Sequence, residues 1–180
     1  MKNQNTKKLA YAALFLALCL VLPMLTGQIP QIGSMLLPMH IPVLLCGLVC
    51  GWQYGAAVGF VAPLLRSVLF GMPPMYPVAI AMAFELLTYG LVIGLVYRRM
   101  AQKGAAGVYA ALLTAMAAGR LVWGMAEVVL LGLGGKAFTA QAFLAGALLN
   151  AVPGIIVQLV LIPAVMAALQ KAGAVKEYAE

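Results

Sequence analysis

The stretch LLPMHIPVLLCGLVCGWQYGAAVGFVAPLLRSVLFG, residues 36–71, decides how many helices this chain forms. It is almost uninterrupted apolar sequence, and a membrane-spanning helix takes roughly 20 such residues. The run is therefore too long for one crossing and a little short for two. The segment GWQYG at 51–55 supplies a natural turn inside it.

The composition is that of an integral membrane protein. Hydrophobic residues make up 65% of the 180-residue chain and charged residues 8%, with a mean hydropathy of +1.05, whereas a soluble domain carries about 25% charged residues. The length leaves room for about six spans and no separate soluble domain. We therefore expect one all-α transmembrane bundle over residues 1–180, embedded in the lipid bilayer of the cell membrane.

The distribution of basic residues favours two crossings within residues 36–71. With two crossings, eight Lys and Arg residues fall on one side of the membrane and only Lys136 on the other; with one crossing the split is four against five. Basic residues collect on the cytoplasmic side, so we assign the net charge of +7 to topology rather than to nucleic-acid binding. The sequence predicts both termini in the cytoplasm and six helices, at about 7–26, 36–50, 55–71, 77–97, 107–132 and 140–169.

The basic, apolar start is similar to a signal peptide, but no small-residue cleavage site follows, so we expect an uncleaved first helix. Cys19, Cys46 and Cys50 lie in apolar runs and are interpreted as reduced packing residues. Glycines recur at every fourth position from Gly47 to Gly59, a spacing that lets helix backbones approach closely.

Charged residues inside the apolar runs indicate a binding site. In AAGRLVWGMAEVVLLG, residues 117–132, Arg120 and Glu127 lie seven residues apart on one helix face, although each buried charge costs roughly 2.5–3.5 kcal/mol in a bilayer. Depth counting also places Arg66 and Glu85 in the outer half of the membrane. The pattern predicts a substrate pocket open to the outside, whose candidate residues are Arg66, Glu85, Arg120, Glu127, Asn150 and His40.

The alternative is that Arg66 with Glu85, and Arg120 with Glu127, are buried ion pairs that only fix helix packing. Such pairs rarely stabilise a fold more than apolar residues would, which favours the pocket. His40 is a ligand contact or a helix-start histidine bonded to a backbone carbonyl. Arginine suits a carboxylate or phosphate because its planar fork donates two parallel hydrogen bonds.

Uncharged segments rich in Pro, Gly and Met, at 26–42 and 71–77, flank the expected mouth of the pocket and are interpreted as lids. The sequence contains no hydrolase, metal-site or phosphate-loop motif. We therefore expect neither an enzyme nor a bound cofactor or metal.

Two segments, KKLAYAALFLAL (7–18) and MHIPVLLCGLVCGWQYGAAVGF (39–60), together with the six-span topology and outward pocket, resemble the S components of energy-coupling factor (ECF) transporters. The resemblance implies a substrate-binding subunit whose transport is driven by a transmembrane coupling subunit and two cytoplasmic ATPases. It also implies that Ala13 and Ala17, in an AxxxA spacing, dock on the coupling subunit. An ordinary intramolecular contact of these small residues is the alternative.

The expected function is therefore high-affinity capture of a water-soluble vitamin or related micronutrient, anionic and pantothenate- or folate-like, for an ABC-type importer. The first alternative is a small stand-alone secondary transporter, which predicts polar groups in the inner half of the membrane or an inverted repeat; the sequence displays neither. The second is a membrane interaction or assembly protein whose polar groups serve only packing.

Overall fold

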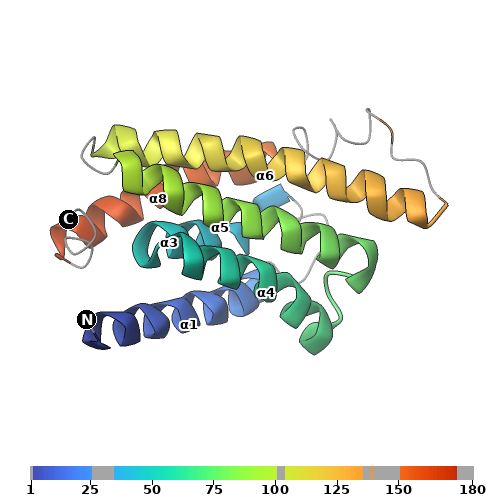
Figure 1. Cartoon of the computed structure of the whole chain (residues 1–180), viewed down its shortest axis with the longest axis horizontal. Helices are drawn as coiled ribbons and strands as arrows, with labels where there is room; N and C mark the ends of the chain where they lie inside the picture. Colours follow the sequence, from blue (N-terminus) through green and yellow to red (C-terminus); the bar gives the residue numbers. More distant parts are fainter. Residues whose placement is uncertain (1, 26–34, 101–103, 136–138, 140–150, 174–180) are drawn as a thin grey trace.

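The computed structural model describes residues 2–25, 35–100, 104–135, 139 and 151–173, and every regular element in these ranges is helical (Figure 1). The elements in chain order are α1 (Lys2–Leu25), α3 (His40–Cys50), α4 (Trp52–Phe70), η1 (Met75–Ala79), α5 (Ile80–Met100), α6 (Ala105–Leu133) and α8 (Val152–Lys171). The all-α expectation is confirmed.

Five helical segments in the described ranges are long and apolar enough to cross a membrane: α1, α4, the continuous η1–α5 segment, α6 and α8. The chain is thus a multi-pass membrane protein. The sixth expected span corresponds to α3, an apolar helix of 11 residues that is about 16 Å long, against a hydrocarbon core of about 30 Å. A complete sixth crossing stays a prediction.

A single glycine separates α3 from α4. Gly51 has φ 95° and ψ 169°, a conformation that is essentially restricted to glycine, and α4 begins at Trp52. The reversal that the sequence places over residues 51–55 is therefore completed at Gly51, and the helix expected from residue 55 starts three residues earlier. Before the glycine, the helix that the sequence predicts from residue 36 corresponds to α3, which begins at His40.

Glycines let α3, α4 and α5 pack backbone to backbone. A β-carbon added at Gly55 would lie 2.7 Å from Gly47 Cα and 2.8 Å from the Gly90 carbonyl oxygen. Gly59 similarly faces the backbone of Leu86. The close approach expected from the fourfold glycine spacing is confirmed, and it places α5 at the centre of the bundle, packed against both α4 and α6.

Basic residues of the described ranges gather at one end of the bundle. The start of α1, the α3–α4 junction, the end of α5, the start of α6 and the end of α8 lie at this end (left in Figure 1). This end, here called the basic end, carries Lys7, Lys8, Arg98, Arg99 and Lys171. The beginning of α1 and the end of α8 thus share one end; that this end is cytoplasmic stays a prediction.

Candidate functional site

Three helices bring an acidic, a basic and an imidazole side chain together inside the bundle. Arg120 of α6 places Nη1 3.1 Å from Oε1 of Glu85 on α5. His40, the first residue of α3, places Nε2 3.5 Å from the same oxygen. Glu85 is 1% exposed and His40 1% exposed, so the Glu85 carboxylate is an internal junction between α3, α5 and α6.

These residues lie at similar depth. Glu85 and Arg120 are each about 15 residues, or roughly 22 Å, from the end of their helix at the basic end. His40 is only about 15 Å from the basic end, because α3 is short. Its side chain points toward the N-terminus of α3 and so reaches further away from the basic end. Gln158 of α8 is buried at a comparable depth. We call His40, Glu85 and Arg120, which the ion pairs join, the polar cluster.

Tyr89 and Gly119 frame the polar cluster. Tyr89 follows Glu85 by one turn of α5, and its ring meets the His40 ring edge-on, with centroids 5.2 Å apart and planes at 62°. On the other side the Tyr89 ring lies directly against Gly119, where a β-carbon would overlap its Cδ1 and Cε1 atoms. The sequence reasoning did not select either residue, although the four-residue spacing from Glu85 to Tyr89 places both on one helix face.

Several polar atoms around Arg120 are buried without a hydrogen-bond partner among the residues that the structure describes. The donors are Nε and Nη2 of Arg120 and, on α8, Nε2 of Gln158. Oε1 of Glu85 is an acceptor without a hydrogen bond, and the two ring nitrogens of His40 also have none; in a neutral imidazole one of them donates and the other accepts. Leaving a buried donor or acceptor unsatisfied costs about 1–3 kcal/mol per group. The two Arg120 nitrogens therefore have an unmet demand for hydrogen-bond acceptors.

The two unpaired arginine nitrogens share one edge of the guanidinium. Nη1 is occupied by Glu85, so Nε–H and Nη2–H remain as two parallel donors. This is the geometry that binds both oxygens of a carboxylate or phosphate. Glu85 thus fixes Arg120 while leaving its two-donor edge for another acceptor.

Arg66 contacts α1 and its own helix, and its part in the pocket stays a prediction. Its Nη1 donates to the Leu20 carbonyl of α1 at 2.5 Å, and its guanidinium lies over the Phe70 ring, 5.3 Å from the centroid. Arg66 therefore fastens α4 to α1. The sequence alternative paired Arg66 with Glu85 and Arg120 with Glu127. In the structure Glu85 instead pairs with Arg120, because α5 packs directly on α6.

Glu127 is 6% exposed and lies two turns beyond Arg120 on α6, about 10 Å along the helix axis. No ion pair between Arg120 and Glu127 is seen among the described residues. Asn150, the remaining pocket candidate, lies outside the described residues. Ala13 and Ala17 are both exposed on α1, so an intramolecular contact of this stripe is not seen in the described parts of the chain.

One of the two expected lid segments is described. Within residues 71–77, the Tyr76 hydroxyl donates a hydrogen bond to the Leu130 carbonyl near the end of α6. The segment therefore connects the α4–α5 turn to the same helix that carries Arg120 and Glu127. Most of the other segment, residues 26–34, lies outside the described part.

Comparison with known proteins gives one match. A family model described as "ECF transporter, substrate-specific component" matches residues 7–167. No curated protein and no solved structure matches the chain.

Proposed function

The chain belongs to the substrate-specific components of ECF transporters, and from this premise we propose that it captures a small water-soluble acid, a vitamin or related micronutrient, in a pocket around Arg120. Members of this family are substrate-binding subunits of transporters rather than enzymes. The finer assignment of the substrate rests on the polar cluster.

The observation that carries the proposal is the unpaired Nε/Nη2 edge of Arg120. A ligand carboxylate satisfies both donors at once, and hydrogen bonds between charged groups are roughly twice as strong as neutral ones. The Glu85 carboxylate already balances the charge of Arg120. The site thus recognises the ligand carboxylate through directed hydrogen bonds rather than through a net positive charge.

The other buried polar groups indicate which hydrogen-bonding groups the rest of the ligand carries. Glu127 offers a carboxylate acceptor about 10 Å along α6 from Arg120, and His40 and Gln158 offer buried nitrogen atoms. The matching ligand carries an acid at one end and N–H or O–H groups toward the other. Pantothenate- and folate-like acids both have this pattern.

The surface of α1 fits the partner expected for this family. Ala13 and Ala17 are exposed, and larger apolar side chains beside them, Leu9, Leu14 and Val21, are also exposed. Small residues on an outward face let a second helix approach closely. We assign this face to a transmembrane coupling subunit that two cytoplasmic ATPases drive.

Transport measurements test the proposal. The purified chain is reconstituted in liposomes alone or together with a coupling subunit and two ATPases, and uptake of radiolabelled pantothenate or folate is followed with and without internal ATP. We expect saturable binding by the chain alone and concentrative uptake only with the full module and ATP. Concentrative uptake by the chain alone would refute the proposal and establish the stand-alone transporter.

A further inference from the structure

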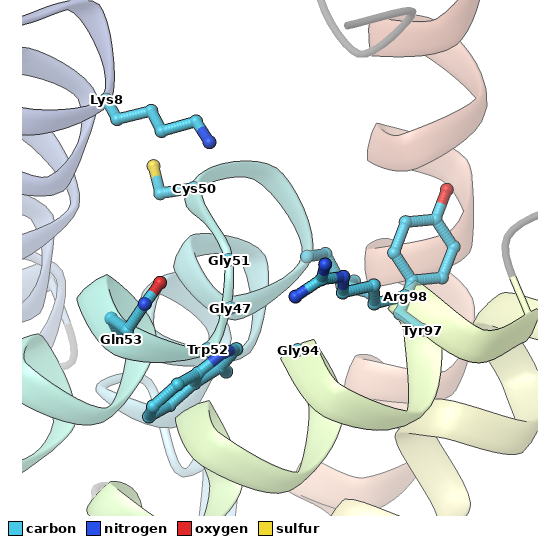
Figure 2. A pocket seen from close by; sticks show the side chains of 10 residues that line it. Lys8, Gly47, Cys50, Gly51, Trp52, Gln53, Gly94, Tyr97 and Arg98 are labelled. Carbon is cyan, nitrogen blue, oxygen red and sulfur yellow. The ribbon is translucent and has the colours of Figure 1, made fainter. Parts of the chain in front are cut away.

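A cavity whose lining includes no residue of the polar cluster opens at the basic end. It has a volume of about 290 Å³ and lies where α1, the α3–α4 junction and the end of α5 meet (Figure 2). That is just below the range of roughly 300–1,000 Å³ typical of pockets for drug-sized ligands. The lining residues are Lys8, Gly47, Leu48, Cys50, Gly51, Trp52, Gln53, Gly94, Tyr97 and Arg98.

Among the described residues, the lining carries two positive charges and no negative one. Lys8 comes from α1 and Arg98 from α5, and Figure 2 shows Arg98 extending toward the Gly51 turn while the Lys8 ammonium group lies near Cys50 on the other side of that turn. Two cationic side chains from different helices that line one hollow produce a local field that attracts an anion.

The backbone adds to this field. α4 begins at Trp52 with a glycine cap that offers no side chain, and its first turn contains no acidic residue. The first N–H groups of a helix carry a partial positive charge and bind anions, phosphates in particular. Gly51 leaves its side of the hollow without a side chain, since a β-carbon there would meet nothing within 4 Å, whereas Gly47 and Gly94 pack against α5 and the start of α4.

We propose that this cavity binds the phosphate group of an anionic phospholipid. The basic end is where the helices leave the hydrocarbon core, and Trp52 and Tyr97, which line the cavity, are of the residue types that settle at the lipid headgroup level. The inference does not depend on the substrate assigned to the polar cluster.

The test is native mass spectrometry of the full chain in detergent, titrated with phosphatidylglycerol or with phosphatidylcholine of the same acyl chains. The chain offers matched controls: Lys8→Gln and Arg98→Gln alter lining residues, whereas Lys7→Gln and Arg99→Gln remove the same charge from exposed neighbours that do not line the cavity. Thermal unfolding of each variant checks folding, and Arg98→Lys checks that charge is sufficient at that position.

We expect wild type to bind phosphatidylglycerol more tightly than phosphatidylcholine. Each lining variant should lose about fivefold in affinity, each control less than twofold, and Arg98→Lys should retain binding. Equal losses in lining and control variants would overturn the proposal, because net charge would then explain the lipid preference. Displacement of the lipid by equimolar glycerol 3-phosphate would overturn the lipid assignment in favour of a soluble phosphate.

Discussion

Replacing Gly119 with alanine tests the packing that holds the polar cluster. The new methyl group would overlap Cδ1 and Cε1 of Tyr89. Tyr89 is 2% exposed and its ring is held against His40 at 5.2 Å, so it has little room to withdraw. The substitution therefore pushes Tyr89 toward His40, or α6 away from α5.

The expected cost follows from two opposing effects. Adding a methyl group to a tightly packed interior typically costs 1–3 kcal/mol, while alanine is better than glycine in a helix by about 1 kcal/mol. We expect Gly119→Ala to lower the free energy of unfolding by up to about 2 kcal/mol, because the expected contact of the new methyl group with the ring is very close. Gly132→Ala is the matched control in the same helix, since a β-carbon there meets nothing within 4 Å, and it should be neutral or stabilising.

The assay is equilibrium unfolding in mixed micelles, with Tyr89→Leu added to form a double-mutant cycle. If the overlap is the cause, Gly119→Ala should cost less in the Tyr89→Leu background than in wild type. Equal unfolding free energies for Gly119→Ala and Gly132→Ala would refute the reasoning, as would strict additivity with Tyr89→Leu.

Three further predictions concern charge and backbone. Glu85→Gln leaves the Arg120 charge without its partner and should cost about 3–5 kcal/mol in unfolding free energy, partly regained by adding Arg120→Gln; no regain would show that Glu85 does not stabilise through Arg120. Arg66→Met removes the bond to Leu20 and should cost about 1.5–3 kcal/mol with unchanged affinity for acids in equilibrium dialysis, and a lost affinity would return Arg66 to the binding site. Gly51→Ala should cost about 1–3 kcal/mol in thermal unfolding, and an unchanged melting temperature would contradict the strain assigned to φ 95°.

The helices were predictable because a membrane imposes length and polarity on each span. The run expected at 107–132 corresponds to α6, Ala105–Leu133, and the charge of the loops located the basic end. The boundary at Gly51 was less predictable, because a glycine with positive φ reverses the chain in one residue and needs none of the turn expected over 51–55.

The partners of the buried charges were harder to predict. Spacing along one helix gives the depth and face of Arg120 and Glu127 but not which helices are neighbours. Seven residues separate these two by about 10 Å, whereas the packing of α5 on α6 brings Glu85 within 3.1 Å of Arg120. Gly119 carried a usable signal, since a buried glycine beside a buried arginine marks a place where another side chain comes close.

The central claim is that Arg120 holds the carboxylate of a captured nutrient. The most direct measurement is mass spectrometry of small molecules released from freshly purified wild type, Arg120→Met and Arg66→Met, each verified as folded by thermal unfolding. We predict a small carboxylic acid in near-stoichiometric amount on wild type and Arg66→Met, and its loss from Arg120→Met. The same acid retained at the same level by folded Arg120→Met would contradict the account.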